Sequence, residues 1–231
     1  MSIRERLDIS AYLVIGQENT TRPVEEVVAA AVSEGFTCVQ IRSKVATARE
    51  MIDTLDKSAA VIRELGKSDS VALLVDDRLD VVLAARDAGI KVDGVHVGQS
   101  DIPVEVCRKY LGADSIIGLS ARTEELIDYV KATDVSQIDY FGAGPLHRTP
   151  TKLDCGKTSD GRLITHDFDE FAELAKVSPI PVVVGGGVKL KDIPALAATN
   201  IAGFFVVSAV AGADNPQLAA RELVEAWRQH H

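Results

Sequence analysis

Charged residues follow several short apolar segments of this 231-residue sequence. Residues 39–44 read Val-Gln-Ile-Arg-Ser-Lys, so on a strand Gln40, Arg42 and Lys44 share one face while Ile41 faces the other way. Two cations on an inward face are unfavourable unless an anion or nearby carboxylates neutralise them. The pattern predicts an anion-binding face, with an internal ion pair as the alternative.

Carboxylates end the next two apolar segments. Asp76 and Asp77 follow the apolar residues 73–75, and Asp101 follows the segment 94–100, which reads Gly-Val-His-Val-Gly-Gln-Ser. Carboxylates gathered at one edge repel each other unless a proton or a cation separates them. Mg²⁺ binds one or two carboxylates together with diphosphate oxygens and water, so we expect a magnesium site. Helix capping is the alternative for the Asp-Asp pair.

Hydroxyls and glycines suited to phosphate follow four other segments. Ser120 ends one apolar segment, 149–152 reads Thr-Pro-Thr-Lys, 185–187 is a triple glycine, and Val207-Ser208 ends the last apolar segment. Lysine and hydroxyl side chains can neutralise and hydrogen-bond a phosphate, and glycines let backbone N–H groups approach it. We expect phosphate groups to bind at these segments, although helix caps, turns and solvated loops use the same residues.

These residues must be positioned by a repeating pattern of short apolar and longer helical segments. Eight apolar segments rich in Val and Ile are expected to be strands: Ala11–Ile15, Thr37–Ile41, Val71–Val75, Gly94–Val97, Ser115–Leu119, Ile138–Tyr140, Pro181–Val184 and Gly203–Val207. The helical patterns between and after them are Val24–Ser33, Ala48–Leu65, Leu79–Ala88, Val104–Leu111, Glu124–Lys131, Phe168–Lys176, Asp192–Ala198 and Leu218–Arg228.

Eight strand–helix units predict a (β/α)₈ TIM barrel, formed by residues 1–231 as a single domain. An open doubly wound sheet is the main alternative, but it usually has a glycine-rich loop after its first strand. Here the glycine cluster follows the seventh strand. The long segment 147–165 interrupts the pattern and is expected to be a functional lid or disordered. The active site of such a barrel gathers at the carboxyl ends of the strands.

Composition narrows the partners and the compartment. The formal net charge of −9 argues against nucleic acid or an anionic membrane surface as a partner, because both require a broad basic face. Cys38, Cys107 and Cys155 lack the spacing of a zinc site or disulfide framework and are expected to be reduced. Without a signal-peptide or membrane-spanning pattern, the cytoplasm is the expected location. The sequence leaves open whether the chain is a homo-oligomer.

The motifs together resemble those of the thiamine phosphate synthase family from Tyr12 to Ala211. The resemblance is carried by these segments: Val39–Lys44, Asp76-Asp77, Gly94–Asp101, Gly118–Ala121, Thr149–Lys152, Gly186-Gly187 and Val207-Ser208. Each segment alone is weakly specific. Their order and spacing along one chain make the combination specific.

The resemblance implies a Mg²⁺-dependent enzyme that joins 4-amino-5-hydroxymethyl-2-methylpyrimidine diphosphate to a (carboxy)thiazole phosphate and releases pyrophosphate. It implies pyrimidine diphosphate binding by Gln40, Ile41, Arg42, Ser43, Lys44, Ser120 and Lys152. It implies magnesium ligands at Asp77 and Asp101, and thiazole phosphate binding by Thr149, Thr151, Gly187, Val207 and Ser208. The expected substrate-binding set also includes Asp76, Pro150 and Gly186. Arg42, Lys44, Ser120 and Lys152 are the expected catalytic residues, and electrostatic stabilisation of the leaving group requires no covalent protein nucleophile.

Two departures from the family pattern leave alternatives open. The family usually has Asn where this chain has Asp76, and the segment 153–165 also differs from the usual one. One alternative is a thiazole tautomerase-like barrel, which would have no obvious use for the diphosphate-handling residues Arg42, Lys44, Asp77, Asp101 and Lys152. The other is a non-catalytic barrel that binds thiamine phosphates and acts through regulatory partners.

Overall fold

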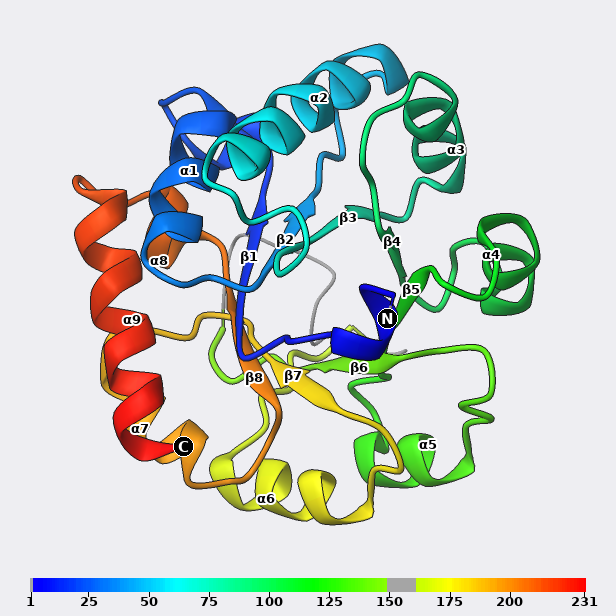
Figure 1. Cartoon of the computed structure of the whole chain (residues 1–231). Coiled ribbons are helices and arrows are strands. Elements are labelled where there is room, and N and C mark those ends of the chain that lie inside the picture. The colour runs from blue at the N-terminus through cyan, green and yellow to red at the C-terminus, as the bar shows by residue number, and fades with distance from the viewer. Residues whose placement is uncertain (1, 149–160) are drawn as a thin grey trace.

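The computed structural model describes residues 2–148 and 161–231. Eight parallel strands close into a barrel in sequence order, and β1 (Ala11–Ile15) pairs with both β2 (Cys38–Ile41) and β8 (Gly203–Val206). The view along the barrel in Figure 1 shows the strands at the centre, surrounded by helices. The predicted (β/α)₈ fold class is therefore confirmed.

The remaining strands are β3 (Ala72–Asp76), β4 (Gly94–Val97), β5 (Ile116–Ser120), β6 (Tyr140–Ala143) and β7 (Val182–Val184). The helices are α1 (Val24–Ser33), α2 (Ala48–Glu64), α3 (Leu79–Asp87), α4 (Val104–Leu111), α5 (Leu126–Ala132), α6 (Phe168–Val177), α7 (Ile193–Ala197), α8 (Ser208–Ala211) and α9 (Pro216–His230). Short 3₁₀ turns occupy Arg4–Arg6, Gln17–Asn19 and Leu190–Asp192.

Side chains alternate along each strand between two apolar cores. On β1, Leu13 and Ile15 pack in the large core between barrel and helices, whereas Tyr12 and Val14 pack inside the barrel. On β3, Leu73 faces outward in the same way. Because the strand period is two residues, the register that buries the outer apolar side chains also fixes which polar side chains face inward.

Local signals begin several helices where the sequence pattern predicts them. Thr47 caps α2 in a reciprocal pair with Glu50, and Asp167 caps α6 in the same way with Glu170. These caps satisfy backbone N–H groups that have no partner within the helix. They fix where each helix leaves the loop that follows its strand.

The boundaries of β6 and α8 differ from the sequence prediction. The sixth strand runs over Tyr140–Ala143 and not Ile138–Tyr140, because Gly142 lies within the strand. A Cβ at Gly142 would lie 2.9 Å from His96 Cε1, so this glycine makes room for an inward ring and does not start a turn. Ser208, expected at a strand end, begins the unpredicted four-residue helix α8.

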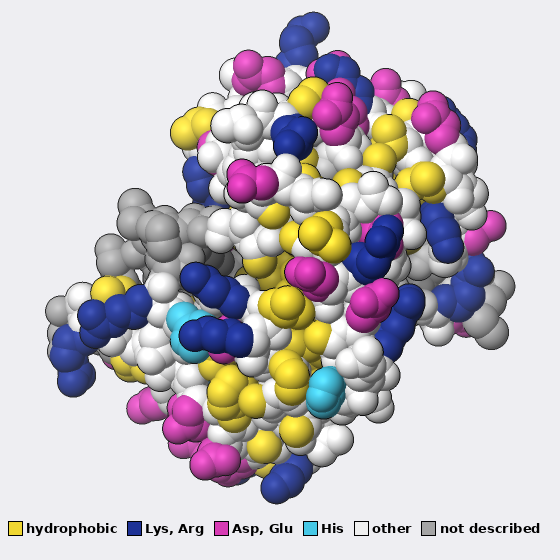
Figure 2. Space-filling model, turned by 90° about the vertical axis from the view of Figure 1, so that its left-hand side faces the viewer, with side chains coloured by type: hydrophobic (Ala, Val, Ile, Leu, Met, Phe, Trp, Pro, Cys, Tyr) yellow, Lys and Arg dark blue, Asp and Glu magenta, His cyan; other side chains and the backbone are white. Residues whose placement is uncertain are grey.

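The face that carries α1 and α9 mixes both signs of charge (Figure 2). Lys and Arg side chains are interspersed there with Asp and Glu, and Arg221 of α9 is ion-paired with Glu34 beside α1 at 2.9 Å. Within residues 2–148 and 161–231, no helix is long and apolar enough to cross a membrane.

Candidate active site

The carboxyl ends of the strands surround a cavity of about 450 Å³. Segments following β2 to β5 give it a charged half, and those following β7 and β8 give it a glycine-rich, more apolar half. This is the end of a (β/α)₈ barrel at which loops assemble active sites. The sequence placed its candidate residues at this same end.

Gln40, Arg42 and Lys44 all line the charged half, as the alternation along the strand predicts. Gln40 and Arg42 are buried, and Arg42 Nε lies 3.0 Å from Asp76 Oδ2. Lys44 is about half exposed and ion-pairs with Asp77. The alternative of an internal ion pair is therefore confirmed, while anion binding by these cavity-lining cations stays a prediction.

Ile41 and Ser43 are not among the residues that line the cavity. Ile41 is 2% exposed and packs in the outer core. The Ser43 hydroxyl accepts hydrogen bonds from the backbone N–H groups of Val45 and Ala46, at 3.2 and 2.9 Å. The Ile41 side chain therefore packs the barrel wall and the Ser43 side chain stabilises the loop that carries Lys44, and substrate binding at these two positions stays a prediction.

Asp77 and Asp101 come from different strands, yet their carboxyl groups are in hydrogen-bonding contact. Burial, and then the contact with Asp77, raises the pKa of Asp101. Burial also acts to raise the pKa of Asp77, but hydrogen bonds with Lys44 and Asp101 outweigh it and lower that pKa. Asp101 also accepts a hydrogen bond from Gly98 N at 2.9 Å. The two carboxyl groups are therefore in contact, and their pKa values are shifted in opposite directions.

Ser120 joins a buried hydrogen-bonded chain that begins at the edge of the cavity. Ser120 Oγ lies 2.9 Å from His96 Nε2, and His96 Nδ1 lies 3.0 Å from Tyr140 Oη. A Cβ at Gly118 would collide with both rings, so the inward glycine of β5 makes room for this contact. His96 is buried and also lines the cavity.

The chain continues across the barrel to the charged half. Tyr12 Oη lies 2.8 Å from both Tyr140 Oη and Gln40 Oε1, and Gln40 Nε2 lies 2.5 Å from Asp76 Oδ1. Burial raises the pKa of both tyrosines well above the ordinary value, so both hydroxyls stay protonated. We call the six residues Ser120, His96, Tyr140, Tyr12, Gln40 and Asp76 the floor chain.

Arg122 adds a third cation to the charged half. Its guanidinium lies 5.3 Å from the centre of the Tyr129 ring, and its Nε lies 3.3 Å from Gln99 Oε1. Gln99 in turn donates to the Ser120 carbonyl at 2.6 Å and to Tyr129 Oη at 2.8 Å. Among the described residues, no carboxylate lies within ion-pairing distance of Arg122.

Gly186 and Gly187 shape the opposite half of the cavity. Both have left-handed backbone conformations, with φ of 81° and 75°. A Cβ at Gly186 would lie 2.5 Å from Pro145 Cβ, and one at Gly187 would lie 2.8 Å from His147 Cβ. Glycine is therefore required here by conformation and by space. Val207 and Ser208 line the same half.

The predictions for Thr149, Pro150, Thr151 and Lys152 lie outside the described residues. The segment leading to them is described as far as Arg148. Its residues Leu146 and His147 donate backbone hydrogen bonds to the carbonyls of Gly185 and Gly186, at 3.0 and 2.9 Å. This pairing joins the start of the loop after β6 to the glycine loop after β7.

Sequence reasoning missed Tyr12, Tyr140, Gln99 and Arg122, which contribute to the cavity or to its floor. A signal for the floor was available: Tyr or His occupies inward positions of otherwise apolar strands, while Gly118 and Gly142 leave space beside them. The position of Arg122 depends on the loop after β5, which strand alternation does not constrain.

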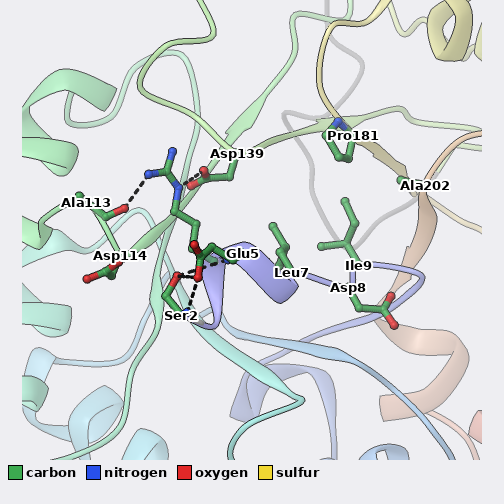
Figure 3. A pocket seen from close by; sticks show the side chains of 11 residues that line it. Ser2, Glu5, Leu7, Asp8, Ile9, Ala113, Asp114, Asp139, Pro181 and Ala202 are labelled. Atoms are coloured by element: carbon green, nitrogen blue, oxygen red, sulfur yellow. Dashed lines mark hydrogen bonds and ion pairs between the residues drawn. The ribbon is translucent and has the colours of Figure 1, made fainter.

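A second cavity, of about 560 Å³, lies at the opposite end of the barrel. The Arg4 guanidinium reaches the Ala113 carbonyl and the Asp139 carboxylate there, both at 2.6 Å (Figure 3). Asp139 is also ion-paired with Arg108 at 2.8 Å and accepts a hydrogen bond from Ile117 N. Asp139 at this end therefore already has several partners within the protein.

Comparison with known proteins gives a consistent family. Residues 11–210 match the model of the family described as Thiamine monophosphate synthase. A thiamine-phosphate synthase of Corynebacterium efficiens is 38% identical over 222 residues, which cover 96% of each chain. A thiamine-phosphate synthase of Vibrio parahaemolyticus is 35% identical over 92% of this chain and 95% of the relative.

A solved structure extends this result to the fold. The thiamine phosphate pyrophosphorylase from Pyrococcus furiosus aligns with a TM-score of 0.78 and 27% identity, covering 98% of each chain. The family match covers most of the chain, including the segments that carry the cavity-lining residues. This chain belongs to the thiamine monophosphate synthase family.

Proposed function

We propose that this chain is a thiamine phosphate synthase, which joins 4-amino-5-hydroxymethyl-2-methylpyrimidine diphosphate to a (carboxy)thiazole phosphate and releases pyrophosphate. The observation that carries the proposal is the division of one cavity into a half with cations and paired carboxylates and a half built on two left-handed glycines. Two substrates with different charge distributions require such a division. The names of the relatives support the same reaction.

In this proposal the pyrimidine diphosphate occupies the charged half. Arg42 and Lys44 bind the diphosphate together with Lys152, and Gln40 and Ser120 contact the pyrimidine side. Arg122 is a further diphosphate ligand, because among the described residues it is a cavity-lining cation with no carboxylate within ion-pairing distance. A guanidinium in this state can bind phosphate without first losing an ion pair.

Asp77 and Asp101 would hold Mg²⁺. Two carboxyl groups in contact repel each other when both are ionised, so the pair forms a suitable place for a divalent cation. Among the described residues no group of three or more His, Cys, Asp or Glu could hold a metal, which suits an ion that takes its other ligands from diphosphate and water. When bound, the ion would neutralise charge that develops on the leaving diphosphate.

The thiazole phosphate occupies the other half. Gly186 and Gly187 leave their backbone exposed to the cavity without a Cβ in the way, and Ser208 supplies a hydroxyl on the same side. Val207, Thr149, Pro150 and Thr151 complete the proposed set. Backbone N–H groups at such a loop can bind phosphate without adding positive charge.

The reaction breaks the C–O bond between the pyrimidine methylene carbon and the diphosphate, and forms a C–N bond to the thiazole nitrogen. The electron pair of the C–O bond leaves with pyrophosphate, and the nitrogen supplies the pair of the new bond. Arg42 and Lys44 stabilise the negative charge that accumulates on pyrophosphate, with Lys152 and Arg122. No step requires a covalent bond to the protein.

The test is an assay that follows pyrophosphate and thiamine phosphate together. We expect equal amounts of both products when both substrates and Mg²⁺ are present, and no sustained release when either substrate is left out. Binding of both substrates without product would support the non-catalytic alternative. Conversion of the thiazole phosphate alone to a tautomer would support the tautomerase alternative.

A further inference from the structure

The floor chain links the cavity edge to an ion pair on the other side of the barrel through five consecutive hydrogen bonds. Its order is Ser120, His96, Tyr140, Tyr12, Gln40 and Asp76. Each inner member has one donor and one acceptor engaged in the chain. If the residue at one end of the floor chain must accept a hydrogen bond, every following hydrogen bond must therefore run in the same direction.

Asp76 determines the direction at its end. As a carboxylate ion-paired with Arg42, it can only accept hydrogen bonds. Gln40 must therefore turn its Nε2 amide group toward Asp76 and its Oε1 toward Tyr12. The amide orientation, which distances alone do not decide, follows from the charge of Asp76.

The same direction passes through both tyrosines to His96. Tyr12 uses its hydroxyl proton on Gln40 Oε1, so its oxygen accepts the proton of Tyr140. The oxygen of Tyr140 must then accept from His96 Nδ1. A neutral imidazole protonated on Nδ1 has an acceptor at Nε2, which takes the hydroxyl proton of Ser120.

We propose that Asp76 acts through the floor chain as a positioning residue, which holds His96 as the Nδ1–H tautomer and makes Ser120 Oγ a hydrogen-bond acceptor toward the cavity. Resting on the proposed function, this assigns Ser120 a partner on the substrate. The diphosphate has no N–H groups, whereas the exocyclic 4-amino group of the pyrimidine has two. Ser120 therefore recognises that amine and does not donate to the leaving group.

An amide in place of the Asp76 carboxylate reverses the direction of the hydrogen bonds along the floor chain. Arg42 Nε–H can only donate, so in an Asp76→Asn variant the introduced amide must turn its carbonyl oxygen to Arg42 and its NH₂ group to Gln40. Gln40 then donates to Tyr12, Tyr12 donates to Tyr140, and Tyr140 donates to His96 Nδ1. His96 becomes the Nε2–H tautomer and donates to Ser120, whose own proton is released toward the cavity.

Nitrogen-15 NMR of the histidine side chains tests this without substrate. The chain has five histidines, and the resonances of His96 are identified by their loss in His96→Gln. We expect the proton on Nδ1 in the wild type and on Nε2 in Asp76→Asn. The control Asp80→Asn also removes one negative charge, but Asp80 lies on α3 and is not part of the floor chain. We expect this control to leave the His96 tautomer unchanged.

A Tyr12→Phe background interrupts the chain between Gln40 and Tyr140. In that background, adding Asp76→Asn is expected to leave the His96 spectrum unchanged. A wild-type His96 protonated on Nε2, or a tautomer that Asp76→Asn does not reverse while Tyr12 is present, overturns the proposal. The wild-type measurement stands even where a variant folds poorly.

Binding to the pyrimidine diphosphate and to its analogue without the 4-amino group tests the role of Ser120. We expect calorimetry to show roughly tenfold weaker binding of the analogue by the wild type, and a ratio near one for Asp76→Asn and Ser120→Ala. An unchanged ratio in both variants overturns the assignment of the amine. Failure of the wild type to bind either compound counts against the proposed function. The tautomer of His96 is measured without substrate, so that result does not depend on the proposed function.

Discussion

Each end of this barrel has a cavity, and the two cavities differ in how their charged groups are paired. At the amino end, in a cavity of about 560 Å³, Asp139 contacts two arginines and a backbone N–H group. At the carboxyl end, in a cavity of about 450 Å³, the carboxyl groups of Asp77 and Asp101 are in contact, and Lys44 is half exposed. Cavity volume does not distinguish these ends, but the availability of charged groups does.

The difference follows from how the strands begin and end. At the amino end, Arg108 of α4 donates to the carbonyl of Ser115 at 2.6 Å and to Asp139, joining the starts of neighbouring strands. At the carboxyl end the loops project their charges into one space. We therefore expect substitutions at the two ends to affect different quantities, stability at one and turnover at the other.

The largest expected effect is on turnover, from Asp101→Asn. Loss of one of the two carboxylates proposed to hold Mg²⁺ should slow pyrophosphate release about a thousandfold, or about 4 kcal/mol in the activation free energy. The melting temperature should stay the same or rise slightly, because the change removes one of two adjacent carboxyl groups. Steady-state kinetics and calorimetric melting check both. A variant with a much lower melting temperature and a wild-type kcat would contradict the expectation that substitutions at the carboxyl end affect turnover and not stability.

The next effect is on stability, from Arg108→Gln at the amino end. Arg108 is nearly buried and donates to the Asp139 carboxylate and to two backbone carbonyls, so its loss leaves Asp139 with the more exposed Arg4 as its cation and removes a donor from both carbonyls. The free energy of unfolding should fall by about 3 kcal/mol. Denaturant titration measures this, with Arg78→Gln, an exposed ion-pair variant, as control. The value of kcat below the melting range should not change, and a selective loss of kcat would contradict the comparison.

Arg122→Gln is expected to have a smaller effect. Arg122 is exposed at the rim, so its contribution to diphosphate binding is reduced by solvent. The pyrimidine diphosphate should bind about tenfold more weakly, about 1.4 kcal/mol, and the thiazole phosphate should bind as before. Arg78→Gln is again the control, because Arg78 is held by Asp80 at 2.6 Å. If both substrates bound equally more weakly, Arg122 would act through the overall electrostatic field of the cavity and not through a direct contact with the diphosphate.

The smallest effect concerns pH and the contact between α1 and α9. Hydrogen bonds from Arg221 and Gln217 lower the pKa of Glu34 from 4.5 to about 2. A lowered folded-state pKa stabilises the protein above pH 4.5, and this contribution is lost as the pH falls toward about 2. Glu34→Gln should therefore reduce stability at neutral pH by less than about 1 kcal/mol, and the difference should vanish in acid. Melting curves across this range would show it, and a constant difference would contradict the assignment.

The sequence predicted the barrel well because its signals are local and repeated. Eight apolar strands alternate with helical patterns, and β1 and β4 have the predicted bounds. The predicted sixth strand ended at Tyr140, before Gly142, whereas β6 continues to Ala143. The role of Gly142, to leave space for His96, depends on a side chain from another strand and so is not visible locally.

The candidate site likewise has one part that the sequence predicted and another part that it did not. The contact between Asp77 and Asp101 was predictable, because the carboxyl ends of parallel strands meet at one edge. Arg122 was not, since its position depends on Gln99 and Tyr129 from other segments. The floor chain was also missed, because its members are joined across the barrel interior and not along the sequence.

A magnesium titration of pyrophosphate release by the wild-type chain tests the central claim most directly. We expect release to stop in excess chelator and to return on addition of Mg²⁺. Thiazole phosphate affinity and the melting temperature should change little, because Gly186 and Gly187 lie in the other half of the cavity. Full activity in excess chelator with both substrates present would contradict the proposed roles of Asp77 and Asp101.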